Sequence, residues 1–358
     1  MQMKSDASVN EGEKMTAQLQ ADTTTNAQSN INQPTMKAIV REQYGAPDVL
    51  ELKELPKPVV DDDGVLVRVR AASINAYDWH MMRGQPFLVR MSEGWRRPKN
   101  VAMGVDLAGQ VESVGKNVTQ FRPGDEVYGA RVGALAEYVR GGPQSALAPK
   151  PAGLTFEQAA AVNMAGTTAL QGLRDKGQLK PGQRVLINGA TGGVGSFAVQ
   201  IAKAFGAHVT AVCSTKNVDM VRSLGADEVI DYTREDFTRS GQRYDLILDV
   251  AASRSLSACR RVLTPNGTLV LVGVADGRHM VPIAARLLAA MIWSRFKRQK
   301  MLPFMAHNSA ADLLVLKDLI EAGKVKPVID RTYPLGETAE AMRYLETGHA
   351  RGKVVITL

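Results

Sequence analysis

The sequence predicts an α/β protein in which a β-rich region precedes a doubly wound parallel sheet. Three observations support this class. Residues 36 to 155 alternate apolar and polar side chains in short segments broken by glycine and proline, a pattern typical of half-buried strands. From residue 156 the pattern becomes helical and then alternates with apolar, β-branched runs. The length of 358 residues, with 32 glycines and 5% aromatic residues, suits two domains with many tight turns.

Residues 1 to 35 differ from the rest of the chain. They are rich in Thr, Asn, Gln and Ser, and they contain no aromatic residue and no arginine. Such a segment buries too little apolar surface to offset its ordering entropy, so we expect a disordered tail. It has neither the apolar run of a signal peptide nor the arginines of a transit peptide.

The first domain is expected over residues 36 to 155. Its predicted strands include "MKAIV", "VLELKEL", "DGVLVRVRAASI" and "VDLAGQVESVG". The segment Pro123-Gly124-Asp125 in "FRPGDEVYG" predicts a turn, because proline fixes φ and glycine tolerates unusual backbone angles.

The second domain is expected over residues 156 to 307. Five apolar runs, "RVLING", "HVTAVCS", "EVIDY", "YDLILDVAA" and "TLVLVGV", are separated by helical patterns. The right-handed crossover rule then favours a Rossmann sheet. Residues 308 to 358 contain two amphipathic helical patterns and a last strand, "GKVVITL", which we expect to return to the first domain.

Net charge and cysteine content limit the classes of function that the chain can have. The net charge of +8 suits a phosphorylated cofactor, and no RNA-binding aromatic signature or zinc-finger spacing accompanies it, so we expect no nucleic-acid partner. Only Cys213 and Cys259 are present, which excludes a disulfide scaffold and a four-thiolate zinc centre and favours the cytoplasm. No apolar run reaches the ~20 residues that a membrane span needs.

A glycine-rich loop is the strongest functional signal. The predicted strand 184–188 runs into a loop and then into an apolar-periodic helix, as a dinucleotide-binding loop requires. Glycine gives the tight turn, lets the backbone approach a diphosphate and lets the helix pack closely. The predicted contact residues are Ala190, Thr191, Gly192, Gly193, Val194 and Gly195.

The residues after the second strand of this sheet favour NADPH over NADH. An NAD site has an acidic residue about 20 positions beyond the loop, whereas this chain has Ser214, Thr215 and Lys216 there. A hydroxyl and an ammonium would bind a 2′-phosphate, which a carboxylate would repel. The alternative is that Lys216 is an ordinary exposed lysine in a first helical turn.

Taken together, "PGDEVYG", "AGTTAL" and "NGATGGVG" resemble the medium-chain dehydrogenase/reductase superfamily, and in particular its zinc-independent quinone oxidoreductase branch. The resemblance covers residues 36 to 358. It implies a GroES-like catalytic domain beside the Rossmann domain. It also implies NADPH-dependent hydride delivery to a small electrophilic acceptor, a quinone or an α,β-unsaturated carbonyl, in a cleft between the domains.

The same resemblance argues against a metal site. The zinc-dependent members have two cysteines and a histidine where this chain has Asn75, Val105 and Asn163. Zinc needs about four nitrogen, sulfur or carboxylate ligands, or three and a water. We therefore expect none.

A new ligand set is the alternative, formed by Asp78, His80 and Asp106. Residues two positions apart do not share a face of a helix, although they share a face of a strand. We favour the metal-free interpretation.

The stretch "SINAYDWH" contains the predicted catalytic residues. By resemblance, Asn75 and Asp78 line the active cleft, with Asn75 contacting the substrate or the nicotinamide ribose. The alternative is that Asn75 forms a turn and Asp78 caps a helix. Tyr77 is the nearest hydroxyl donor, and it either supplies a proton or forms an ordinary wall of the site.

Further cofactor contacts follow from the resemblance. Thr167 is expected near the diphosphate or nicotinamide, and Tyr232 near the adenosine phosphate. Gly273 and Val274 are expected at the nicotinamide amide, and Lys353 is expected to approach the cofactor from the terminal segment. Ligands of open α/β sheets bind at the carboxyl ends of strands, which independently supports Tyr232 and Gly273.

Two features leave other functions open. Several relatives have a tyrosine shortly after the glycine matching Gly84, but here Phe87 follows, and residues 88–103 form a long basic segment that reshapes the expected entrance. The alternatives are a metal-free alcohol or aldehyde dehydrogenase, and a non-catalytic NADPH-binding sensor. A homodimer is expected, in which residues 301–306 extend the sheet across a two-fold axis.

Overall fold

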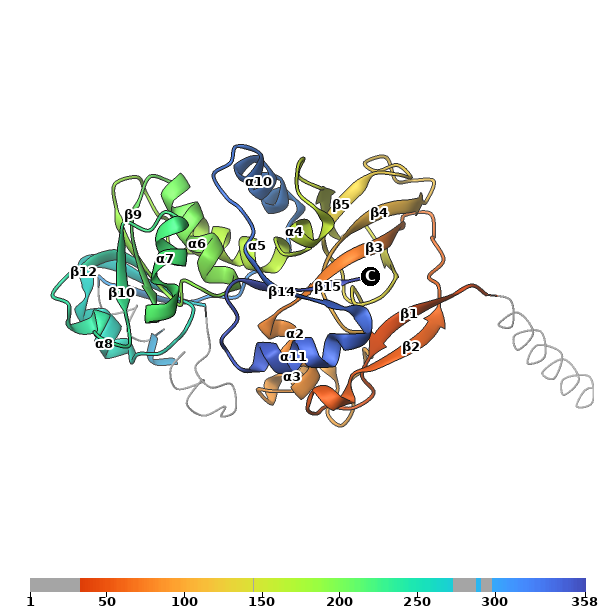
Figure 1. Cartoon of the computed structure of the whole chain (residues 1–358), viewed down its shortest axis with the longest axis horizontal. Helices are drawn as coiled ribbons and strands as arrows, with labels where there is room; N and C mark the ends of the chain where they lie inside the picture. Colours follow the sequence, from red (N-terminus) through yellow and green to blue (C-terminus); the bar gives the residue numbers. More distant parts are fainter. Residues whose placement is uncertain (1–32, 144, 273–287, 291–297) are drawn as a thin grey trace, which may run out of the picture.

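The computed structural model describes residues 33–143, 145–272, 288–290 and 298–358. Two sheets lie at opposite ends of the molecule, and helices α4, α5 and α10 lie between them (Figure 1). Most of the predicted tail falls outside the described residues, and so do Gly273 and Val274. The predicted domain boundaries at residues 155 and 307 remain predictions.

The first of these sheets is parallel throughout and has six strands in the order β10-β9-β8-β11-β12-β13. Its strands are nearly continuous apolar runs, because helices cover both faces of a parallel sheet. The predicted doubly wound sheet is confirmed. The strands and their helices are β8 (Arg184–Asn188), α6 (Gly193–Ala204), β9 (His208–Cys213), α7 (Val218–Ser223), β10 (Glu228–Asp231), β11 (Tyr244–Asp249), α8 (Leu256–Arg261), β12 (Leu263–Leu271) and β13 (Lys300–Pro303).

The second sheet, here called the mixed sheet, has seven strands in the order β14-β15-β3-β4-β5-β7, with β6 paired to β3. A separate antiparallel pair, β1 with β2, flanks it. The side chains of β1, β2 and β6 alternate in burial as the sequence predicts, whereas β3, β4 and β15 are buried along most of their length. They are β1 (Thr35–Val40), β2 (Glu51–Pro56), β3 (Val65–Ile74), β4 (Asp106–Val114), β5 (Glu126–Ala130), β6 (Tyr138–Gly141), β7 (Ala146–Pro149), β14 (Ile329–Pro334) and β15 (Lys353–Thr357).

The remaining helices connect or cover the two sheets. Helix α5 packs beside α6 between the sheets, while α2, α3 and α11 lie together below the mixed sheet in the view of Figure 1. A short π-helical turn over residues 172–176 continues α5. The helices are α2 (Ala76–Arg83), α3 (Leu88–Glu93), α4 (Phe156–Ala160), α5 (Asn163–Gln171), α10 (Ala310–Glu321) and α11 (Thr338–Glu346).

Strand register in the mixed sheet brings distant segments together. The last strand, β15, runs antiparallel to β3, with Val354 opposite Ile74. On its other edge β3 pairs with β4, with Ser73 opposite Asp106. The carboxyl end of β3, the start of β4 and the start of β15 therefore meet at one point, and this point lies beside α5.

Candidate functional site

The glycine loop, residues 189–195, joins β8 to α6 with the geometry that a dinucleotide diphosphate needs. A side chain at Gly195 would place its Cβ 2.1 Å from the carbonyl oxygen of Gly189, so only glycine fits there. At Gly192 the same Cβ would meet nothing nearer than 4.0 Å, so this side of the loop is open. The first N–H groups of α6 have no acceptor within the helix, and they give the loop its affinity for anions.

The terminal segment contacts this loop directly. The N–H of Gly352 donates to the carbonyl oxygen of Thr191 at 2.8 Å, and Gly192 forms a parallel β-bridge with Gly352. A Cβ at Gly193 would lie 2.9 Å from Cδ of Lys353. Lys353 therefore runs past the glycine loop toward the end of β3.

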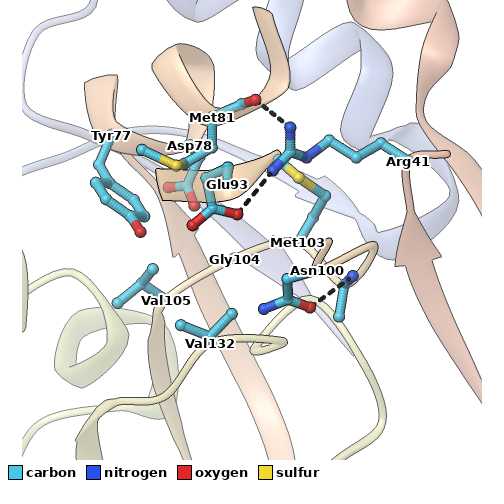
Figure 2. A pocket seen from close by; sticks show the side chains of 11 residues that line it. Arg41, Tyr77, Asp78, Met81, Glu93, Asn100, Met103, Gly104, Val105 and Val132 are labelled. Atoms are coloured by element: carbon cyan, nitrogen blue, oxygen red, sulfur yellow. Dashed lines mark hydrogen bonds and ion pairs between the residues drawn. The ribbon is translucent and has the colours of Figure 1, made fainter. Parts of the chain in front are cut away.

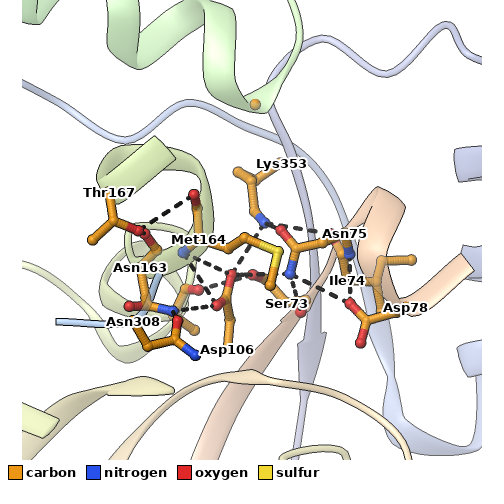
Figure 3. A network of polar contacts seen from close by, with 12 residues as sticks. Ser73, Ile74, Asn75, Asp78, Asp106, Asn163, Met164, Thr167, Asn308 and Lys353 are labelled. Carbon is orange, nitrogen blue, oxygen red and sulfur yellow. Dashed lines mark hydrogen bonds and ion pairs between the residues drawn. The ribbon is translucent and has the colours of Figure 1, made fainter. Parts of the chain in front are cut away.

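The Lys353 ammonium ends in a buried polar cluster, defined as Ser73, Asn75, Asp78, Asp106, Asn163 and Lys353 (Figure 3). It donates a short hydrogen bond to Oδ1 of Asn75 and lies 3.4 Å from both the Ile74 carbonyl oxygen and Oδ2 of Asp106. The side chains of Lys353 and Asp106 are 3% and 0% exposed. A buried charge is tolerated only when it is paired and hydrogen-bonded, as this one is.

Asp106 is the centre of the cluster. Its carboxylate accepts hydrogen bonds from the hydroxyl of Ser73 at 3.1 Å, the amide of Asn163 at 2.8 Å and the backbone N–H of Met164 at 3.2 Å. The Nδ2 of Asn75 donates to it at 3.0 Å. One carboxylate thus ties β3, β4 and α5 together. The sequence analysis considered Asp106 only as a metal ligand and missed this role.

Asp78 supports the helix-capping alternative. Its Oδ2 accepts from the backbone N–H of Asn75 at 2.8 Å and from Nδ2 of Asn75 at 3.3 Å, at the start of α2. Burial, followed by the nearby charge of Asp106, raises the pKa of Asp78 from 3.8 to about 7. All polar atoms of the Asn75 side chain are engaged within the cluster.

A pocket of about 40 Å³ lies on the other side of Asp78 (Figure 2). It is large enough for a few waters or a small polar group, and too small for a whole quinone ring. Segment 88–103 contributes Glu93, Asn100 and Met103 to its wall. Its lining includes Arg41, Tyr77, Asp78, Met81, Glu93, Asn100, Met103, Val105 and Val132.

Arg41 and Glu93 are the charged residues of this pocket that the sequence analysis missed. The guanidinium of Arg41 is buried, donates to the Met81 carbonyl oxygen and lies 3.7 Å from Oε2 of Glu93. Its Nε has no hydrogen-bond partner. Burial lowers the pKa of Arg41, whereas burial and the charge of Glu93 raise the pKa of Tyr77. A raised pKa makes Tyr77 a weaker acid and keeps its hydroxyl protonated at neutral pH.

The residue types at the expected zinc positions do not fit zinc. Asn75 and Asn163 both donate their amide N–H groups to Asp106, and the Val105 side chain has no ligand atom. The Asp106 carboxylate already interacts with an ammonium. Within the described ranges, no group of three or more His, Cys, Asp and Glu side chains could hold a metal ion. His80 points elsewhere, with Nδ1 2.7 Å from the Gln85 carbonyl oxygen.

The predicted phosphate-binding residues lie at the carboxyl ends of β9 and β10, which pair in parallel. Lys216 is exposed, and Tyr232 is 54% exposed with its N–H bonded to the Cys213 carbonyl oxygen at 2.9 Å. Ser214 is partly buried. The carboxylate of Asp231 lies in the same region, where it accepts a 2.5 Å hydrogen bond from the hydroxyl of Thr215.

Thr167, which is expected near the diphosphate or nicotinamide, is buried in α5. It is 2% exposed, and its hydroxyl donates back to the Asn163 carbonyl oxygen within α5. The structure thus brings Asn75, Asp78 and Lys353 together, with Thr167 nearby in Figure 3. Tyr77 lines the pocket instead, across from Arg41 (Figure 2).

Comparison with known proteins agrees with this architecture. The alcohol dehydrogenase GroES-like domain family matches residues 61–165, and the zinc-binding dehydrogenase family matches residues 224–356. A mitochondrial NAD(P)H oxidoreductase, RTN4IP1, from Mus musculus is 36% identical over 371 residues, covering 94% of this chain and 91% of that protein. A chloroplastic NADPH-dependent alkenal/one oxidoreductase from Arabidopsis thaliana is 34% identical over 336 residues, covering 90% and 79%.

A solved structure shows the same fold. The quinone oxidoreductase from Coxiella burnetii superposes with a TM-score of 0.79 at 30% identity, covering 91% of this chain and all of that one. None of the helices in the described part of the chain is both long and apolar enough to span a membrane. The chain belongs to the medium-chain dehydrogenase/reductase superfamily, among relatives that are quinone and enone oxidoreductases.

Proposed function

We propose that the chain is an NADPH-dependent, metal-independent oxidoreductase that reduces a quinone or an α,β-unsaturated carbonyl. One observation carries the proposal. The terminal segment joins the open face of the glycine loop to the buried polar cluster through Gly352 and Lys353. The nucleotide loop and a cluster of chemically active side chains are thus neighbours. The relatives named for quinone and alkenal/one reduction support the acceptor class.

The residues of the glycine loop fit a dinucleotide. Gly192 leaves space for the diphosphate, and the start of α6 favours its charge. Ser214, Lys216 and Tyr232 would hold the adenosine end, with Gly273 and Val274 proposed at the nicotinamide. When bound, the reduced cofactor supplies a hydride to the acceptor.

The polar cluster would face the acceptor, and the pocket beyond Asp78 has room only for a small polar group of it. Asp78 lines the pocket together with Tyr77, Val105 and Val132, and Asn75 contacts Asp78 from the cluster. An electrophilic acceptor needs orientation and exclusion of water more than it needs a Lewis acid. The donor set around Asp106 does not fit zinc, and this supports the metal-independent part of the proposal.

The preference for NADPH rests on Lys216. Fluorescence titration should show that NADPH binds at least tenfold more tightly than NADH, because a lysine at the ribose favours a 2′-phosphate. Lys216→Ala should weaken NADPH binding and leave NADH binding unchanged. Lys176→Ala, an exposed lysine on the π-helical turn, is the control. Equal affinities for the two cofactors in the wild type would contradict the preference.

Turnover separates the proposed enzyme from its alternatives. We expect steady NADPH oxidation with simple quinones or enones. NADP⁺ reduction by alcohols alone would instead identify an alcohol dehydrogenase. Tight NADPH binding without turnover across a broad panel of acceptors would identify a sensor.

Two further expectations belong to the proposal. Cys213 and Cys259 are both buried and form no disulfide, which suits the reducing cytoplasm. A homodimer is supported by β13, which ends the parallel sheet among the strands that are described, and by Met305, which is 91% exposed just beyond it. β13 is an edge strand in the described part of the chain, and an edge strand beside an exposed apolar side chain favours pairing with a second copy.

A further inference from the structure

We propose that Lys353 is the cation that binds the acceptor oxygen as it becomes negatively charged, and that Asp106 positions it. This rests on the proposed function and assigns Lys353 to the acceptor rather than to the nucleotide. In the reaction, the acceptor carbon gains a hydride from the reduced nicotinamide. The π-electron pair moves to the acceptor oxygen, and a proton from solvent later neutralises the resulting enolate or phenolate.

The position of Lys353 supports this role. Its side chain passes Gly193 of the glycine loop, and its ammonium ends among Asn75, Ile74 and Asp106 at the end of β3 (Figure 3). A molecule held between the loop and the cluster would therefore meet this charge. In the parts of the chain with assigned burial, the buried cations are Lys353 and Arg41, and Arg41 lies in the pocket with Glu93 opposite it.

The ammonium has hydrogen-bonding capacity to spare. Its contacts with the Ile74 carbonyl oxygen and Asp106 are both 3.4 Å, which is longer than an ordinary N–H···O hydrogen bond. Only the bond to Asn75 is short. An acceptor oxygen can replace one of the long contacts without leaving the ammonium unpaired.

Asp106 fixes this charge without blocking it. Ser73, Asn75, Asn163 and Met164 all donate to its carboxylate, so it is held from several elements at once. A fixed charge in a dry site stabilises a developing oxyanion far more than a mobile one in water.

The test uses Lys353→Met, which keeps the length of the side chain and removes its charge. We expect kcat with a quinone to fall by about 10²- to 10³-fold, as when an oxyanion donor is removed, with the NADPH dissociation constant within about threefold of wild type. Lys203→Met is the matched control, because Lys203 forms an ion pair with Asp227 away from the cluster. It should leave both quantities unchanged.

A second measurement does not depend on turnover. The absorbance of 4-nitrophenol reports its ionisation. We expect binding to the wild type to lower the pKa of this phenol by about one unit or more. Lys353→Met should abolish the shift. Asp106→Asn, which removes the opposing negative charge, should enlarge it. A purely structural role of Lys353 would not give opposite effects in the two variants. If Lys353→Met does not fold, Asp106→Asn still tests the proposal.

The outcomes separate the two proposals. A tenfold weaker NADPH affinity in Lys353→Met with an unchanged phenol shift would assign Lys353 to the cofactor and overturn the inference. A wild type that shifts the phenol but oxidises no NADPH would refute the proposed function and support the cation site. No phenol shift in the wild type would overturn the cation site whatever the turnover.

Discussion

The charges of the buried polar cluster decide its chemistry. Two buried carboxylates, Asp78 and Asp106, lie in the same cluster as one buried ammonium, Lys353, which pairs with Asp106. One positive charge balances only one of them, so the other retains a proton to higher pH. Asp106 has the ammonium and four further donors, whereas Asp78 has only Asn75. Burial, and after it the nearby charge of Asp106, therefore raises the pKa of Asp78 to about 7.

The raised pKa of Asp78 makes stability depend on pH. Its carboxyl titrates near pH 7 in the folded chain and near 3.8 when unfolded, so the folded chain binds more protons between these values. Its contribution to the free energy of unfolding therefore falls as pH rises through this window, by at most about 1.4 kcal/mol per pH unit. Asp78→Asn should be more stable than the wild type at pH 8 and should lose this slope.

Urea unfolding at pH 5 and pH 8 measures the effect. Asp219→Asn is the control, because the Asp219 side chain is fully exposed. An Asp78→Asn variant whose stability falls between these pH values as steeply as that of the wild type would show that Asp78 is already ionised in the folded chain.

The roles of some of these residues could be predicted from the sequence, and those of others could not. Asp106 carries a signal of its own, because an acidic residue between Val105 and Leu107 at the start of an apolar strand is a buried charge that needs a cation. Its cation, Lys353, lies 247 positions away and is brought there by strand register, which local pattern does not give. The contact between Arg41 and Glu93 depends on the path of segment 88–103, which the sequence did not predict.

The glycine loop is the element whose form followed most directly from sequence. A strand, a glycine-spaced turn and an apolar helix have strong local signals, and β8 and α6 appear where these signals place them. The path of segment 88–103 could not be predicted from the sequence. Its helix α3 lacks an apolar periodicity and depends on contacts with distant residues. One such contact is the hydrogen bond from the Tyr44 hydroxyl to the Gly94 carbonyl oxygen at 2.7 Å.

Two glycines of the loop should respond differently to substitution. Gly192→Ala places its Cβ in open space, so folding should be unaffected while NADPH affinity falls by about tenfold or more, because the methyl group occupies the path of the diphosphate. Gly195→Ala places its Cβ 2.1 Å from the Gly189 oxygen, so it should lower the melting temperature by several degrees.

Thermal denaturation and NADPH titration of both variants test this difference. Gly182→Ala is unsuitable as a control because its φ of +79° strains any side chain. Gly142, which has open space around it and an ordinary φ, is suitable. Unaltered NADPH affinity in Gly192→Ala would place the diphosphate elsewhere.

The molecule as a whole combines two sheets of different construction through one returning strand. The alternation of strand and helix patterns predicted the parallel sheet, and the alternation of apolar and polar residues predicted the β-rich region. The fold class is confirmed for both. The relation between the sheets depends on β15, which pairs with β3 while the preceding residue contacts the glycine loop. This arrangement makes the proposed chemistry a property of the whole chain rather than of either sheet.

The oligomeric state is testable at β13, the last strand of the parallel sheet in the described part of the chain. Met305→Asp places a charge on an exposed side chain next to β13, where it should prevent a second copy from pairing. Sedimentation equilibrium should give the mass of a dimer for the wild type and of a single chain for the variant. Val59→Asp, at a residue 71% exposed in the β-rich region, should remain dimeric. A wild type that sediments as a monomer would refute the dimer.

Direct hydride transfer without a metal is the central claim, and one isotope measurement tests it. The protein is treated with a zinc chelator, dialysed and supplied with NADPH deuterated at C4 together with a quinone or an enone. The account predicts that the reduced enone contains one deuterium at its β-carbon, and that the rate with either acceptor equals that of untreated protein. Absence of deuterium from that carbon, or activity that returns only after zinc is added, would contradict it.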